Sequence, residues 1–416
     1  MILYAAHPQF QQTNVISGGI GEGTGGVTES LKRRIVMPLA GPLAETDHVL
    51  GHELVHAFQY DLMARNRTAA PAGYRLPLWF LEGMAEYLSL GPVDVLTSTW
   101  LRQAAIEGEL PRIEDLDDPR FFPYRFGHAL WAYVAGRFGD EAVGDALRAA
   151  AEGATAVGAL ESVTQQDAGS LSEGWHRSIF ETYGPLLREP VTASDYGRAL
   201  VTDERNGGTV NVAPSLSPSG DRFVFLSERD LFSIDMYVGD SRTGEVRDTI
   251  VKTATDPHFD SLQFIQSSGS WNPSGDAFVF GGVSEGQPVV TIVSVPGGKV
   301  LLEIDYPELG EILNPSWSPD GRTIVFSAVV GGLTDLFLLD VAAGTAEIDR
   351  GRFRGHAARL VSGRPEDRFR HRPVLLTSVR SPLRKLRARD LRRRKRRERA
   401  VDAPRRRRSL GSAMGR

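Results

Sequence analysis

The sequence predicts a multidomain α + β protein, with an α-rich domain over about residues 1–190 and an incomplete all-β propeller over about residues 205–350. Two observations support this fold class. Across residues 45–187, apolar residues recur at three- and four-residue spacing, as on amphipathic helices. After Tyr196, short alternating β runs are separated by turns of Ser, Pro, Gly and Asp. Residues 191–204 form the predicted linker.

The α-rich part is expected to begin with two short strands, Met1–Ala6 and Arg34–Leu39, separated by the glycine-rich stretch Gly18–Gly26. Helices follow where the apolar periodicity is clear and where glycine or proline marks the ends. The predicted helices are Thr46–Met63, Leu78–Ser89, Val95–Glu107, Phe126–Gly136, Glu141–Glu152 and Leu171–Tyr183.

Composition excludes several classes of protein. The 416 residues contain no cysteine, so disulfide scaffolds, thiolate metal sites and cysteine nucleophiles are excluded. No apolar run reaches the roughly 18–20 residues that span a bilayer, so no transmembrane segment is expected. The first ten residues lack the basic flank and apolar core of a signal peptide.

One nine-residue phrase occurs three times in the β-rich part, over Ser217–Phe225, Asn272–Phe280 and Ser318–Phe326. Its prolines lie 55 and 46 residues apart, close to the period of a four-stranded propeller blade. Proline fixes φ for a turn, Asp or Ser bonds the local backbone, and glycine takes a positive φ before a buried strand. The phrase therefore predicts three blades. The alternative is a set of unrelated β-hairpins.

The strongest chemical signal is His52-Glu53-Leu54-Val55-His56. On a helix, residues i and i+4 share a face, so His52 and His56 can bind one metal ion. Glu53 lies beside that face, where a general base for a metal-bound water belongs. The surrounding apolar residues predict a buried helix, and buried histidines need partners. The alternative is a pair of hydrogen-bonded core histidines.

A second apolar helix carries two carboxylates, Glu82 and Glu86, again at i and i+4. A catalytic zinc takes three protein ligands and leaves a fourth position open for water. We expect Glu82 to be the third ligand, and Glu86 to hold a ligand histidine in the required tautomer. The alternative is a solvated carboxylate pair on a surface helix.

The pattern H-E-x-x-H-x25-E, with W-F-x-E-G-x-A-E-Y over Trp79–Tyr87, resembles the gluzincin zinc peptidases, and is most similar to their peptidase-MA-like members. The resemblance implies one zinc per chain and a metallopeptidase domain. It also implies that the tyrosine of a Y-x-x-G phrase, here Tyr124, stabilises the oxyanion. His128 is an alternative donor that we expect to pair within the core instead.

The repeat phrase is similar to the TolB-like propeller repeats of bacterial periplasmic proteins. Together the two resemblances cover about residues 1–350 and imply a periplasmic, cell-surface or secreted protein. Relatives carry an export signal and further sequence before the metal-binding helix, so we expect the chain to be N-terminally truncated. Propellers contain four to eight blades, so three repeats predict an incomplete one.

Charge is distributed unevenly along the chain. Residues 1–350 carry 24 Lys and Arg against 47 Asp and Glu, whereas residues 351–416 carry 24 against 5. This tail would bind nucleic acid if it is genuine, because clustered arginines neutralise phosphates. We interpret it instead as a disordered segment or the product of a reading-frame shift. A six-frame translation beyond codon 350 tests this, since a shifted frame without another repeat phrase would contradict it.

The expected function is peptide-bond hydrolysis by metal-activated water, with Glu53 as general base. The partners would be a peptide or protein substrate and a protein bound by the propeller. The main alternative is a catalytically inactive TolB-like scaffold for protein–protein interaction. Retention of every ligand and of the base argues against an inactive site.

Overall fold

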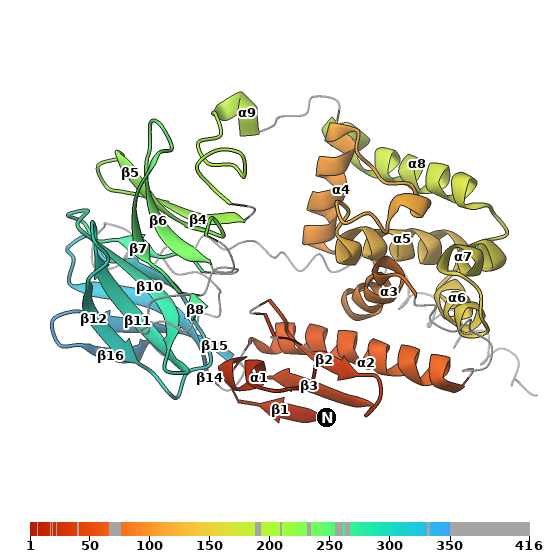
Figure 1. The fold of residues 1–416 in the computed structure, drawn as a ribbon, viewed down its shortest axis with the longest axis horizontal. Helices are drawn as coiled ribbons and strands as arrows, with labels where there is room; N and C mark the ends of the chain where they lie inside the picture. Colours follow the sequence, from red (N-terminus) through yellow and green to blue (C-terminus); the bar gives the residue numbers. More distant parts are fainter. Residues whose placement is uncertain are drawn as a thin grey trace, which may run out of the picture. The chain divides into compact units, whose positions relative to one another are not determined.

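The computed structural model describes residues 1–349 except 6, 17, 19, 22, 40, 66–75, 188–192, 209, 231–233, 254–260, 263–266 and 331–332. Helices predominate before the linker and strands after it, which confirms a mixed fold with several sheets (Figure 1). None of the helices described there is both long and apolar enough to cross a membrane. The Arg-rich tail, residues 351–416, lies outside the described residues.

A small sheet forms the N-terminal end of the chain. Its strands are β1 (Ile2–Tyr4), β2 (Val27–Glu29) and β3 (Arg34–Pro38), in the order β1-β3-β2. β1 runs parallel to β3 and β2 antiparallel to it, so β2 forms one edge. The two predicted strands are confirmed at slightly shorter length. The sequence analysis predicted neither β2 nor the short helix α1 (His7–Gln11).

Every predicted helix is present, with boundaries shifted by up to four residues. The helices after the first sheet are α2 (Leu43–Arg65), α3 (Leu78–Leu90), α4 (Val95–Glu107), the 3-10 helix η1 (Ile113–Asp115), α5 (Pro123–Phe138), α6 (Glu141–Ala151), α7 (Ala156–Thr164), α8 (Ala168–Leu187) and α9 (Ala193–Tyr196). Their shared core contains the fully buried rings of Trp79, Phe80, Trp131 and Trp175. Burial of these large apolar surfaces stabilises the helical part.

Helices α3 and α5 cross at Gly83 and Gly127. A Cβ atom added to Gly83 would lie 2.3 Å from the carbonyl carbon of Gly127. A Cβ on Gly127 would lie 2.2 Å from the carbonyl oxygen of Trp79. Only glycine permits such a backbone approach. The contact brings Glu82, next to Gly83, towards the first turn of α5.

Three antiparallel sheets follow (Figure 1). The first sheet contains β4 (Asn211–Leu216), β5 (Arg222–Ser227), β6 (Asp235–Asp240) and β7 (Val246–Val251). The second contains β8 (Ser261–Leu262), β9 (Ser270–Trp271), β10 (Ala277–Ser284), β11 (Gln287–Ser294) and β12 (Val300–Asp305). The third contains β13 (Ile312–Trp317), β14 (Thr323–Val330), β15 (Leu333–Asp340) and β16 (Thr345–Asp349). In the first and third, consecutive strands pair as in a meander. In the second, β10, β11 and β12 pair consecutively, whereas β8 and β9 both pair with β10.

The repeat phrase forms the turn before β5, β10 and β14. Its glycines, Gly220, Gly275 and Gly321, have φ angles of 73°, 75° and 72°. This confirms the predicted positive φ, which residues with a Cβ rarely adopt. The serine or asparagine that begins each phrase donates a hydrogen bond to an aspartate within the turn, as Ser318 Oγ does to Asp320 at 2.6 Å. Each repeat phrase therefore forms the same kind of tight turn before a strand.

Candidate metal centre

Helices α2 and α3 bring His52, His56 and Glu82 together. The two histidines lie one helical turn apart on α2, and each is less than a tenth exposed. His52 Nε2 lies 3.1 Å from His56 Nε2. Glu82 Oε2 lies 3.1 Å from His52 Nε2 and 3.0 Å from His56 Nε2. Three potential ligand atoms thus converge on one point, in the set that the sequence predicts.

Neighbouring side chains determine which ring nitrogens carry protons. Gln59 Nε2 donates to the carbonyl of Leu81 at 3.0 Å, so Gln59 Oε1 is left as an acceptor 2.8 Å from His56 Nδ1. His52 Nδ1 lies 3.0 Å from the carboxylate of Glu86. Each Nε2 therefore faces the other ring and Glu82, and a neutral ring that carries its hydrogen on Nδ1 would direct its Nε2 lone pair there.

These converging acceptor atoms need a positive charge among them, which a proton or a metal ion can supply. Burial opposes protonation of His52, but its contacts with Glu82 and Glu86 raise its pKa to about 9. Burial likewise opposes ionisation of Glu82, while the two histidines lower its pKa to about 2. A tetrahedral metal with bonds of about 2.0–2.1 Å places its ligands roughly 3.3 Å apart, near the separations here. The residues present can therefore hold a metal ion.

Histidine 48 extends the cluster by one further turn of α2. Its Nε2 lies 3.3 Å from Glu86 Oε1, and His48, His52 and Glu86 form a second group of possible metal ligands. The sequence analysis did not select His48, although its spacing of four residues before His52 was visible. Its Nδ1 lies 3.1 Å from Ser89 Oγ.

Glu86 occupies the position predicted for a residue that supports the ligands. One of its oxygens contacts His48 and His52, and the other accepts a hydrogen bond from Arg125 Nη1 at 2.9 Å. Burial opposes ionisation, but the two histidines hold the pKa of Glu86 well below its usual range. The carboxylate therefore remains ionised and orients His52. Arg125 also lies 3.4 Å from Asp94. The sequence analysis did not predict this role for Arg125.

Glu53 is buried on α2 but belongs to neither group of ligands among the described residues. Thr28 on the edge strand β2 donates from Oγ1 to Glu53 Oε2, with 2.6 Å between the oxygens. A Cβ on Gly26 would lie 2.9 Å from Glu53 Cγ, so the glycine-rich segment before β2 allows this close packing. Glu53 lies beside the possible ligands rather than among them, and its role as general base stays a prediction.

Tyr124 lies in the first turn of α5, and its ring stacks on the His52 imidazole with centroids 5.9 Å apart. Burial raises its pKa, and the negative charges of Glu82 and Glu53 add to the effect. The phenol therefore stays protonated and can donate a hydrogen bond. His128 instead bonds Thr97 Oγ1 and the carbonyl of Gly91, both at 2.8 Å. As expected, it pairs within the core.

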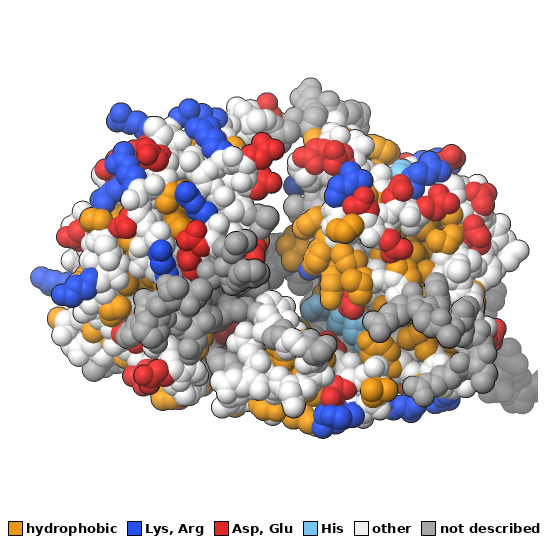
Figure 2. All heavy atoms as spheres, in the orientation of Figure 1, with side chains coloured by type: hydrophobic (Ala, Val, Ile, Leu, Met, Phe, Trp, Pro, Cys, Tyr) orange, Lys and Arg blue, Asp and Glu red, His pale blue; other side chains and the backbone are white. Residues whose placement is uncertain are grey.

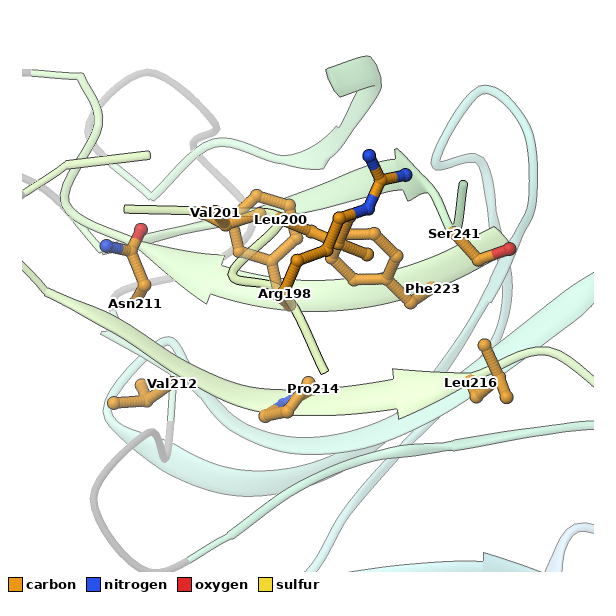
Figure 3. Close-up of a pocket in the computed structure, with 10 residues that line it drawn as sticks. Arg198, Leu200, Val201, Asn211, Val212, Pro214, Leu216, Phe223 and Ser241 are labelled. Carbon is orange, nitrogen blue, oxygen red and sulfur yellow. The ribbon is translucent and has the colours of Figure 1, made fainter. Parts of the chain in front are cut away.

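A separate pocket of about 450 Å³ opens on the first of the three antiparallel sheets (Figure 3). Its wall is mostly apolar, with Leu200, Val212 and Phe223 as examples, and Arg198 extends across it. Asn211 and Ser241 supply polar groups at its ends. No sequence motif indicated this pocket.

Comparison with known proteins finds no matching family model and no matching curated protein. Similar solved structures include TolB from Acinetobacter baumannii (18% identity, TM-score 0.28, 36% of this chain and 34% of that one). They also include a putative TolB from Agrobacterium tumefaciens (21%, 0.26, 33% and 44%) and the Kuenenia stuttgartiensis hydrazine synthase (15%, 0.26, 32% and 40%). The chain thus spans between a third and a half of the length of these proteins.

Proposed function

We propose that this chain is a zinc-dependent peptidase that binds one zinc through His52, His56 and Glu82. The observation that carries the proposal is the convergence of two imidazole Nε2 atoms and one carboxylate, with both Nδ1 atoms facing other side chains. Two histidines and a glutamate form a known donor set of catalytic zinc. Bound there, zinc would act as a Lewis acid that polarises the substrate carbonyl and acidifies water.

Glu53 is the proposed general base. It follows a ligand histidine directly on α2, and its carboxylate is held by Thr28. From this position it can accept a proton from the attacking water and pass it to the leaving amine. Tyr124 would donate a hydrogen bond to the oxyanion, a role for which a protonated phenol beside His52 is suited.

The edge strand β2 suggests how an extended substrate is held. It pairs with β3 on one side, and Thr28 connects it to Glu53. An extended peptide can add to a sheet edge through main-chain hydrogen bonds. Such a peptide would run beside the proposed base, which favours peptides over compact small-molecule substrates.

Hydrolysis of a denatured, unstructured protein such as casein tests this function. Purified chain supplied with zinc is expected to cleave it, whereas Glu53→Gln should lose cleavage and keep zinc. Tyr124→Phe should lower kcat by about 10²–10³ while zinc remains bound. Loss of zinc in Glu53→Gln would assign Glu53 a different role, and full activity in that variant would refute the proposal.

The pocket on the first meander sheet favours a second candidate function, namely a TolB-like propeller module that binds a substrate or a partner protein. Its apolar wall with a few polar groups is typical of a binding site. We further propose a periplasmic or cell-surface location, on the basis of the resemblance to exported bacterial proteins. Cell fractionation tests the location, and recovery only with the cytoplasm would contradict it.

A further inference from the structure

Three aromatic side chains contact one another in a row from the surface of the helical part to the candidate metal centre. The Tyr124 ring lies nearly parallel to the His52 imidazole, at 13°. Phe122 stacks on Tyr124 with centroids 5.2 Å apart, and Trp100 lies 5.5 Å from Phe122. We call Trp100, Phe122 and Tyr124 the aromatic ladder.

The outer two rings of the aromatic ladder are exposed. Trp100 is 44% exposed and Phe122 is 40% exposed. Leu96, one turn before Trp100 on α4, is also exposed and extends the apolar surface. Figure 2 shows apolar side chains gathered beside the histidines on this face of the helical part. A contiguous exposed apolar surface of this kind marks a place of interaction.

The exposed rings are held rigidly by buried or constrained neighbours. Phe122 immediately precedes α5, and Pro123 restricts its backbone to an extended conformation. Trp100 meets the buried ring of Phe126 edge to face, with centroids 6.3 Å apart. A surface that is fixed before binding loses little conformational entropy when a ligand adds to it.

We propose that the aromatic ladder binds a large apolar or aromatic side chain of the peptide substrate, close to the bond that is hydrolysed. This inference rests on the proposed function. It names the substrate class as peptides that carry such a side chain near the scissile bond. The inner end of the aromatic ladder is Tyr124, which stacks on His52. A substrate side chain bound against Phe122 would therefore be separated from the proposed ligand His52 by two ring contacts, Phe122–Tyr124 and Tyr124–His52.

The reach of a peptide agrees with this assignment. An extended chain advances about 3.3 Å per residue, so the two ring contacts correspond to about three residues. Main-chain pairing at β2 would supply affinity without preference for any side chain. The aromatic ladder would supply the preference.

The test uses the full chain with Glu53→Gln and zinc, so that peptides bind without being cleaved. Two fluorescein-labelled decapeptides of Gly, Ser and Ala are compared, one of which carries a single Phe in place of Ala. The Phe peptide is expected to bind at least about tenfold more tightly, because burial of an aromatic side chain is worth this much. Trp100→Ala and Phe122→Ala should each remove most of that preference.

Phe180→Ala is the matched control, since Phe180 is 47% exposed on α8 and is not part of the ladder. This variant should keep the preference. Equal binding of both peptides, or a preference that survives in both ladder variants, would overturn the inference. A ladder that instead joins two copies of the chain would change the mass seen by light scattering in Trp100→Ala without changing peptide preference, which also overturns it.

Cleavage by the wild-type chain separates the two possible failures. If wild type cleaves both decapeptides equally well and the ladder variants do not alter this, only the ladder assignment is wrong. If the zinc-loaded wild type cleaves neither these peptides nor casein, the peptidase function itself fails, and the ladder assignment fails with it.

Discussion

Arg125 links the candidate metal centre to its surroundings at the level of single residues. It donates to the oxygen of Glu86 that does not face His52, and it also contacts Asp94. Second-sphere carboxylates that hold a ligand histidine improve metal binding. Under the proposed function, Arg125 would act through Glu86 as a positioning residue.

Arg125→Met is therefore expected to weaken zinc binding by about 10- to 100-fold. The loss arises because Glu86, which is buried, would lack its guanidinium partner and would hold His52 less firmly. Chelator competition measures the dissociation constant. Arg120→Met is the control, because Arg120 pairs with Asp118 in an exposed position. Equal zinc affinity in wild type and Arg125→Met would show that the ion pair does not support the site.

The stability of the metal-free chain should depend on pH through His52. Its pKa is raised to about 9, despite burial, by Glu82 and Glu86. A histidine whose pKa is higher in the folded state contributes stability that is complete below about pH 6.5 and lost as pH rises to about 9. In chelator, the free energy of unfolding should fall by up to about 3 kcal/mol across that range. Urea titrations measure it, and an equal fall in His52→Gln would contradict the assignment to His52.

Residues with helical spacing could be selected from the sequence, whereas residues that reach the site through tertiary contacts could not. His52, Glu53, His56, Glu82 and Glu86 could be selected because each group follows helical spacing within a short phrase. Thr28 could not, because it reaches the site from a distant segment that belongs to no such phrase. Arg125 lies within the Y-x-x-G phrase of Tyr124, but at a position where the phrase specifies no residue type, so its contact with Glu86 could not be predicted. The zinc itself and the catalytic roles stay predictions.

The crossing of α3 and α5 is the element-level feature on which the site depends. Gly83 and Gly127 lie in the two phrases that also carry Glu82 and Tyr124. Their backbones approach so closely that a methyl group at either position would overlap main-chain atoms. The two glycines therefore set how closely Glu82 and Tyr124 approach.

Gly83→Ala is expected to destabilise the chain by about 2–3 kcal/mol, as overpacking does when backbone must move, and to lower zinc affinity as well. Gly136→Ala is the control on α5, because a Cβ there would meet no atom within 4 Å. That variant should be neutral or slightly stabilising, given the higher helix propensity of alanine. Urea unfolding measures both, and equal stability of the two variants would argue against the crossing.

Element boundaries were predictable where local signals exist. Both ends of α4 were predicted from its apolar periodicity and from the glycine that follows it. In the structure Asp94 accepts a hydrogen bond from the Thr97 amide at its start, and Gly108 adopts a φ of 75° after its end. The strand β2 was missed because three residues in a glycine-rich stretch carry no periodicity. Its formation depends on pairing with β3, which no local pattern reveals.

For the whole molecule, the division of charge separates two possible activities. Residues 1–350 are strongly acidic and residues 351–416 strongly basic. All donors of the candidate metal centre lie in the acidic part, whereas any affinity for nucleic acid must come from the basic part. The predicted domain boundaries near residues 190 and 205 remain predictions.

A chain shortened to residues 1–350 should therefore keep its zinc and its cleavage of casein. The full chain should be retained on heparin at low salt because arginines bind polyanions, and the shortened chain should lose this retention. Elution from a heparin column and zinc content measure the two properties. Loss of zinc from a folded shortened chain would indicate that the tail supports the site.

Zinc content is the measurement that tests the central claim most directly. Elemental analysis of purified wild type should find about one zinc per chain, and His56→Ala should contain none. His176→Ala is the control, because His176 lies on α8 and its Nε2 hydrogen-bonds the carbonyl of Pro111. This variant should keep one zinc. Absence of zinc from folded, monodisperse wild type, or its retention in His56→Ala, would contradict the assignment of His52, His56 and Glu82 as ligands.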